Sequence, residues 1–169
     1  MLTVKVARLA LATIAALLIA TAAGAQTQVR IGELSQLDRQ FMAQQRESIN
    51  DLAAANLGRR LSGDKENDLQ ILQLLLDKRL VTSEQTRELQ AMGVVMGDLL
   101  AADLDMDWVI YEDKQGRSRA LRYRETDEYL FPVTMISRRR EAGNTTPVVE
   151  IYRKAYDIIA PLQPPLPFQ

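Results

Sequence analysis

The chain has 169 residues, 47% of them hydrophobic and 25% charged, and its 21 basic residues nearly balance 22 acidic ones. This balance gives no general attraction to nucleic acid, and the length suits one domain of ordinary size. The chain contains neither cysteine nor histidine, which excludes disulfide bonds, histidine metal ligands and every Ser-His or Cys-His nucleophile. We therefore expect a protein that is not an enzyme and needs neither a cofactor nor a metal ion.

The first 25 residues have the organisation of a secretory signal peptide. Lys5 and Arg8 form a short positive region, and an uncharged apolar stretch follows over residues 9–19. Ala23-Gly24-Ala25 then matches the small-x-small pattern that signal peptidase recognises. The apolar stretch is too short to span a bilayer core of about 30 Å. We expect cleavage after Ala25, export to a bacterial periplasm, and no membrane anchor in the remaining chain.

Apolar residues at helical spacing predict three helices in the first half of the chain. Their expected ranges are residues 33–60, 65–78 and 83–102. The polar segment before them, residues 26–32, is expected to be loose, as new chain termini usually are.

Sequence signals also indicate where these helices begin and how closely they pack. Asp64 is placed to cap the second helix, and Thr82 with Gln85 forms a capping-box pattern before the third. Gly93 and Gly97 lie one turn apart within the third helix, although glycine costs about 1 kcal/mol there relative to alanine. The pair therefore predicts that another backbone packs closely against this helix.

Beyond residue 104 the hydrophobic pattern changes from helical to alternating spacing. Residues 108–111 and 118–123 fit two strands joined by a turn at residues 113–116, which predicts a β-hairpin. A third extended segment begins at Tyr129 and is limited by Pro132, which lacks a backbone N–H.

The last part of the chain predicts two helices and a proline-rich tail. Residues 133–140 fit either a short helix or an edge strand, and we favour the helix. Thr146 as cap and Pro147 at the first helical position are expected to open the final helix. Residues 161–169 hold four of the six prolines, so we expect an extended arm there.

These elements together predict an α+β fold with N-terminal helices, a small antiparallel β-hairpin sheet and a C-terminal helix. We place a single domain over residues 26–160, between the signal peptide and the proline-rich tail.

Two aromatic residues of the hairpin are candidates for an interface. Trp108 and Tyr111 point to opposite faces if the strand alternates regularly. Trp108 is the single tryptophan of the chain. We favour it as a core anchor between sheet and helices, with a place in an interface as the alternative.

Arginine is concentrated in the second half of the chain. The densest run is Arg138, Arg139 and Arg140, and the hairpin carries four more at Arg117, Arg119, Arg122 and Arg124. Together they would form a face able to hold a phosphate or carboxylate. The interpretation we favour is a solvated surface whose ion-pair partners are Glu112, Asp113, Glu125 and Glu128.

Alternating acids at Asp103, Asp105 and Asp107 resemble the opening of a calcium-binding loop. Trp108 and Lys114 occupy the positions where such a loop needs glycine and glutamate, so we expect no calcium site.

One stretch of the chain resembles an uncharacterised family of exported bacterial domains. The residues that carry the resemblance are Leu89-Gln90-Ala91-Met92-Gly93, Gly97-Asp98, Trp108, Asp113, Gly116, and Phe131-Pro132 through Arg138-Arg139. The family is the domain of unknown function DUF3806, and the resemblance covers about residues 88–152. It implies a periplasmic origin and a core of helix, β-hairpin and helix. It assigns no catalytic residue, cofactor or substrate.

We therefore expect a non-enzymatic periplasmic module that binds a macromolecule, with another periplasmic protein as partner. The alternative is a carboxylate-dependent hydrolase of envelope glycans, which needs two acids facing each other at about 5–10 Å. A third alternative is a small-ligand carrier with an enclosed apolar pocket.

Overall fold

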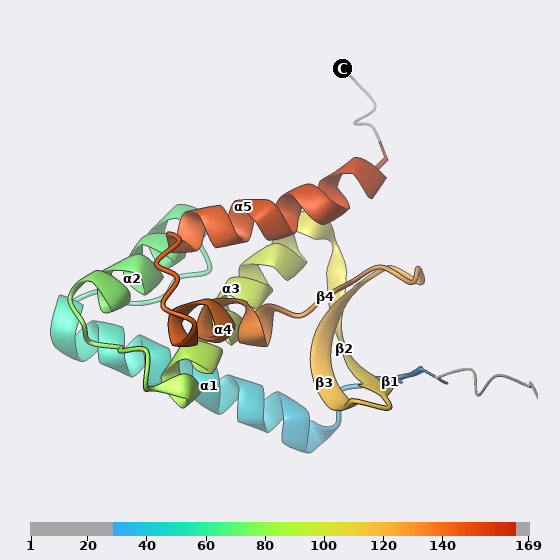
Figure 1. The fold of residues 1–169 in the computed structure, drawn as a ribbon, viewed down its shortest axis with the longest axis horizontal. Helices are drawn as coiled ribbons and strands as arrows, with labels where there is room; N and C mark the ends of the chain where they lie inside the picture. Colours follow the sequence, from blue (N-terminus) through green and yellow to red (C-terminus); the bar gives the residue numbers. More distant parts are fainter. Residues whose placement is uncertain (1–28, 165–169) are drawn as a thin grey trace, which may run out of the picture.

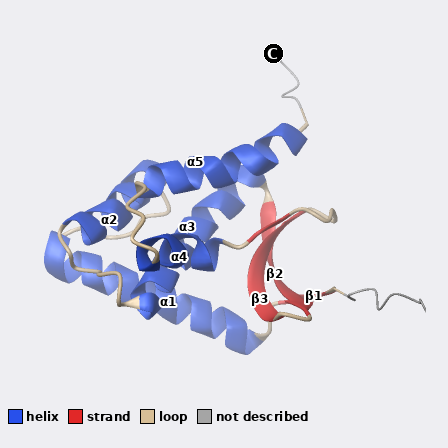
Figure 2. Ribbon diagram, viewed as in Figure 1, coloured by secondary structure: helices blue, strands red, loops and turns tan. Residues whose placement is uncertain are grey.

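The computed structural model describes residues 29–164 (Figure 1). The expected signal peptide lies outside this range, as does the end of the proline-rich tail. Within it, five α-helices and a four-stranded antiparallel sheet form an α+β fold, which confirms the predicted class. Figure 2 shows the helices gathered to one side of the sheet.

The helices lie close to their predicted positions, and α3 is the central one because most of its side chains are buried. The helices are α1 (Gln36–Leu57), α2 (Lys65–Asp77), α3 (Thr86–Leu104), α4 (Met135–Glu141) and α5 (Val148–Ile159). Short 3-10 turns precede α4 and follow α5, over Pro132–Thr134 (η1) and Ala160–Leu162 (η2). The ambiguous segment 133–140 is therefore helical, as favoured above.

The sheet has the order β1-β2-β3-β4. Its strands are β1 (Arg30–Glu33), β2 (Met106–Asp113), β3 (Gly116–Tyr123) and β4 (Tyr129–Leu130). β2 and β3 form the predicted hairpin, which pairs along its whole length from Met106↔Tyr123 to Asp113↔Gly116. β4 pairs with β3 only at Leu121 and Arg122.

β1 corrects the prediction that residues 26–32 are loose. Arg30–Glu33 pairs antiparallel with β2, from Arg30↔Glu112 to Glu33↔Val109. The four residues are mostly exposed and do not alternate between apolar and polar. This segment is a strand because it pairs with the free edge of β2, which lies far away in the sequence.

The predicted start of α2 is confirmed and that of α3 is corrected. Asp64 caps α2, since its Oδ1 accepts the Asn67 N–H at 2.8 Å. Thr82 does not cap α3, which begins at Thr86. Only half of the capping box forms, with the Thr82 N–H donating to Gln85 Oε1 at 2.9 Å, because residues 82–85 close a separate turn through Gln85 N–H and Thr82 O.

The N-terminus of α5 is satisfied from a distant element instead of from Thr146. Pro147 is the capping residue, and the Val148 N–H donates to Gln73 Oε1 of α2 at 2.8 Å. After α5, Pro161 lies in the 3-10 turn η2, which corrects the expectation of an extended arm from that residue. Proline fits the first turn of a helix because no hydrogen bond is required of its nitrogen there.

The two glycines of α3 face the η1 segment, which confirms the predicted close approach. A Cβ at Gly93 would lie 2.5 Å from the Val133 carbonyl oxygen and 2.6 Å from that of Pro132. A Cβ at Gly97 would overlap the Trp108 ring and lie 3.0 Å from the Pro132 Cβ. The missing side chains therefore let η1 and the sheet pack directly on the helix backbone.

Gly93→Ala tests this packing. Alanine is the better helix former by about 1 kcal/mol, but its Cβ overlaps a backbone carbonyl that has little room to move, so we expect a net loss of about 1–3 kcal/mol in unfolding free energy. Urea denaturation measures it. Gly32→Ala is the control, because no atom lies within 4 Å of its Cβ position. A Gly93→Ala protein as stable as the parent would show that η1 does not hold this contact.

Candidate functional site

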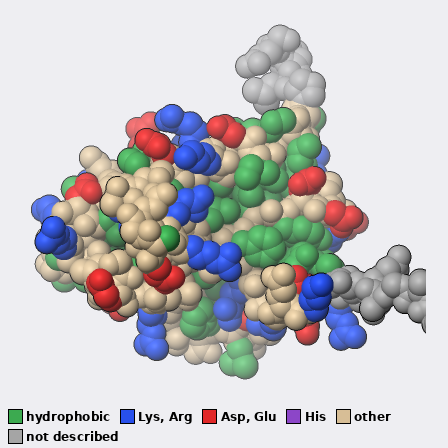
Figure 3. Space-filling model, viewed as in Figure 1, with side chains coloured by type: hydrophobic (Ala, Val, Ile, Leu, Met, Phe, Trp, Pro, Cys, Tyr) green, Lys and Arg blue, Asp and Glu red, His purple; other side chains and the backbone are tan. Residues whose placement is uncertain are grey.

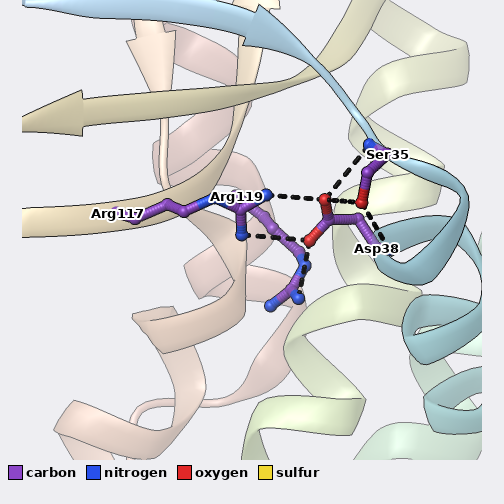
Figure 4. Close-up of polar contacts among 4 residues, drawn as sticks. All are labelled: Ser35, Asp38, Arg117 and Arg119. Carbon is purple, nitrogen blue, oxygen red and sulfur yellow. Dashed lines mark hydrogen bonds and ion pairs between the residues drawn. The ribbon is translucent and has the colours of Figure 1, made fainter.

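A buried carboxylate joins the start of α1 to the hairpin (Figure 4). Asp38 is 3% exposed and lies in the first turn of α1, where Ser35 caps the helix. Arg117 donates two hydrogen bonds to the Asp38 carboxylate, at 3.1 and 2.6 Å, and Arg119 donates a third at 2.9 Å. The Ser35 backbone N–H and hydroxyl both donate to Asp38 Oδ2, at 3.1 and 2.5 Å. This cluster fixes the two arginine side chains of β3.

The charges of this cluster hold Asp38 ionised. The hydrogen bonds from Arg117 keep the pKa of the Asp38 carboxyl well below its ordinary value, and those from Ser35 act in the same direction against the opposing effect of burial. One carboxylate faces two guanidinium groups, so the cluster keeps a net positive charge. The Arg117 side chain is 47% exposed and the Arg119 side chain 25%, which leaves both accessible to a ligand.

A groove of about 550 Å³ runs between β3 and the segment that contains η1 and α4. The hairpin wall includes Tyr111, Asp113, Arg117, Ser118 and Arg119, and the opposite wall consists of Phe131, Val133, Thr134 and Arg138. Figure 3 shows basic side chains gathered on this face between α4 and the hairpin. Asp113 is the sole acid among the lining residues, all of which belong to the described part of the chain. We call this feature the arginine groove.

An aromatic cluster borders the arginine groove. The Tyr111 ring packs edge-on against the rings of Tyr129 and Phe131, with centroid distances of 5.0 and 5.3 Å. Phe131 remains 37% exposed. Tyr111 therefore lies beside the arginines, although it belongs to the other face of the hairpin.

The structure separates the three arginines that the sequence places together. Arg138 is exposed and lines the arginine groove. Arg139 instead donates to the Met135 carbonyl at 2.6 Å, and Arg140 donates to the Thr146 carbonyl at 3.3 Å. Consecutive helical residues point about 100° apart, so a run of three cannot form one face.

The ion-pair partners expected for the arginines were wrong. In residues 29–164, Arg117 and Arg119 pair with Asp38, and Arg124 pairs with Asp105 at 3.6 Å. Arg122 instead donates to the Thr126 carbonyl at 2.8 Å. Sequence reasoning missed Asp38 because Arg117 is 79 positions further along the chain. The local signal was present, since Ser35 and Asp38 show the capping-box spacing.

Trp108 lies between the sheet and the helices, where we placed it as a core anchor. Its ring contacts Gly97, and its Nε1–H donates to Asp98 Oδ1 at 3.0 Å. The same Asp98 carboxylate accepts two hydrogen bonds from Arg46. Trp108 therefore helps connect α1, α3 and β2.

A second, larger groove of about 900 Å³ lies between α2 and α5. Lys65 and Tyr152 line it, and both donate to Asp103 Oδ2, at 2.7 and 2.5 Å. The hydrogen bond to Asp103 raises the pKa of Lys65, while burial and the same carboxylate raise the pKa of Tyr152. Both groups stay protonated at neutral pH, so neither acts as a base there.

No set of three or more His, Cys, Asp or Glu side chains in residues 29–164 is placed to hold a metal ion. None of the helices in that range is long and apolar enough to cross a membrane.

The fold and groove thus define an α+β protein with a basic cleft beside its sheet. The chain belongs to the family described as Domain of unknown function (DUF3806), whose model matches residues 68–152. This confirms the resemblance and extends it to include most of α2. No curated protein matches the chain.

A crystal structure from Bacteroides thetaiotaomicron VPI-5482 has a similar fold, with a TM-score of 0.70. The two sequences are 18% identical, and the alignment covers 79% of this chain and 49% of the other. This chain therefore spans about half the length of that protein, and the likeness shows the fold alone.

The Asp38 cluster predicts a pH-dependent stability. Because the carboxyl pKa is lower in the folded than in the unfolded chain, the unfolded chain binds more protons as the pH falls. The stabilisation is complete above about pH 5 and is lost progressively as the pH falls below the ordinary value of 3.8. Asp38→Asn removes the titrating group, so its urea midpoint will be lower than that of the parent at pH 7. The difference between the two urea midpoints will shrink towards pH 2.5. A difference that stays constant below pH 5 would contradict a lowered pKa of Asp38.

Proposed function

We propose that this protein is a non-enzymatic binding module of the bacterial periplasm and that its arginine groove holds an acidic segment of another protein. The observation that carries the proposal is the meeting of Arg117 and Arg119 from β3 with Arg138 from α4 across one groove. Guanidinium groups bind carboxylates through paired, charge-assisted hydrogen bonds.

Two arginines of the groove are held in place by an ion pair and the third is not, a combination that suits a binding site. Asp38 fixes Arg117 and Arg119 before any ligand arrives, which reduces the entropy lost on binding. Arg138 makes no ion pair or side-chain hydrogen bond with any residue in the range 29–164, so its guanidinium group can turn towards an incoming carboxylate.

Export supports a partner in the cell envelope. Lys5, Arg8 and the apolar residues 9–19 form the pattern of a signal peptide with its cleavage site after Ala25. A chain without cysteine also has no thiol to be oxidised in that compartment.

The geometry gives no support to the alternative of a glycan hydrolase. Among the residues that line the larger groove, the acids are Asp64 and Glu66, which belong to the same turn at the start of α2. Asp64 is occupied as the cap of that helix. Two acids on one wall do not face each other across a glycosidic bond.

A peptide of alternating glutamate and valine tests the proposal by fluorescence anisotropy, with a lysine-valine peptide for comparison. We expect the acidic peptide to bind and Arg138→Gln to weaken it by about tenfold, because one charge-assisted contact is lost. Arg153→Gln is the matched control, since Arg153 lines the other groove. Loss of binding in Arg153→Gln with no effect of Arg138→Gln would move the site to the α2–α5 groove and overturn the proposal.

N-terminal sequencing tests the export. Protein purified from the periplasm of its native host will begin at Gln26, because the peptidase cuts after Ala25. Material that retains Met1 and remains in the cytoplasmic fraction would exclude a periplasmic partner.

A further inference from the structure

The outer edge of β3 is open beside the arginine groove. β4 covers that edge only at Leu121 and Arg122. In the described part of the chain, no strand pairs with the outer side of β3 between Gly116 and Ala120. An open edge presents a row of unpaired backbone N–H and C=O groups.

The register shows which backbone groups face the groove. The Tyr123 N–H donates outward to Glu128 O at 3.0 Å, and Leu121 pairs outward with Leu130. Backbone groups of alternate residues in an antiparallel strand point to the same side. The backbone groups of Arg117 and Arg119 therefore point outward as well, into the groove that these residues line.

Pro132 explains why this edge is open. Its nitrogen carries no hydrogen and cannot continue a ladder, so β4 ends at Leu130. The chain then turns into η1, which packs on Gly93 and Gly97 of α3. The groove occupies the place beside β3 that a longer β4 would fill.

We propose that the acidic partner segment binds here as an added strand, antiparallel to β3 and in line with β4. This inference rests on the proposed function and specifies how the partner is held. A free phosphate or a sugar acid would satisfy the guanidinium groups, but it would leave the outward carbonyl groups of β3 hydrogen-bonded to water alone. Only a peptide backbone supplies donors and acceptors at the strand repeat.

The two faces of the added strand would meet different surroundings. Arg117 and Arg119 lie opposite Glu112 and Ile110, on the face that carries Trp108 and looks towards the helices. Carboxylates on that face of the partner would meet the arginines, and apolar side chains on the other would meet the Tyr111–Phe131 rings. The best partner sequence therefore alternates acidic and apolar residues.

The other edge of the sheet is a poorer site for an added strand, and a second copy of the chain is a poorer occupant of the β3 edge. β1 is the other edge strand, but its residues line neither of the two grooves. Two β3 edges brought together would place the same arginines opposite one another, and like charges across strands are destabilising.

Backbone N-methylation of the glutamate-valine peptide tests the strand pairing, because it removes hydrogen-bond donors and keeps every charge. In an antiparallel pair, the glutamates opposite Arg117 and Arg119 direct their N–H groups at β3. Methylation of the glutamate nitrogens is expected to weaken binding by about tenfold or more, and methylation of the valine nitrogens to leave it nearly unchanged.

Amide hydrogen exchange of the wild-type protein gives a second readout. The Arg117 and Arg119 amides will exchange quickly in the free protein and become protected when the peptide binds. The Ser118 amide, which points towards β2, is the internal control and will be protected in both states.

The outcomes separate this inference from the proposed function. Binding that depends on Arg138 but ignores methylation and protects neither amide would keep the arginine groove as a binding site and overturn the added strand. Weakening by valine methylation alone would overturn the antiparallel arrangement. Concentration-dependent protection without peptide would assign the edge to a second copy, and failure of the acidic peptide to bind at all would overturn both proposals.

Discussion

The contact of α3 with η1 is the constraint on which the rest of the molecule depends. Gly93 allows the backbone of residues 132–133 to lie directly on the helix, and Gly97 leaves room for the Trp108 ring and the Pro132 side chain. Pro132 ends β4 after two residues, and the contact with α3 then holds the chain that leads from the sheet into α4. The course of the chain after β4 and the opposite wall of the arginine groove both depend on this close approach between two backbones.

The groove walls differ in how they are built. On the β3 side, Asp38 joins the α1 cap to Arg117 and Arg119 through five hydrogen bonds to its carboxylate. On the α4 side, apolar packing holds the wall, while Arg138 extends from an exposed position. A rigid wall of oriented donors thus faces a wall with one adaptable cation, an arrangement that combines preorganisation with tolerance for different carboxylate positions.

The sequence predicted those features that depend on local patterns. The apolar stripes of α2 and α3, the hairpin and the Gly93–Gly97 pair each leave a signal within one or two turns of chain. The residues of β1 show no such local pattern, because their strand conformation depends on pairing with β2. Asp38 is a similar case. Its spacing from Ser35 predicts the helix cap, but no local pattern predicts its ion pair with Arg117. The run Arg138–Arg140 suggested one basic face, but the angular position of a residue around the helix axis decides which side chains share a face, and consecutive residues point in different directions.

The walls of the groove are joined through the body of the protein, since each is fastened to a different helix. The β3 wall is bonded to α1 through the Arg117–Asp38 ion pair, and the η1 wall packs against α3 at Gly93 and Gly97. Arg46 of α1 and Asp98 of α3 tie these two helices together, and Asp98 also holds Trp108. The packing of α1 against α3 therefore helps position the two walls, and this ion pair contributes to that packing together with the buried side chains of both helices. Neither Arg46 nor Asp98 lines the groove, so a substitution at either residue can affect a bound ligand only through the packing of the two helices.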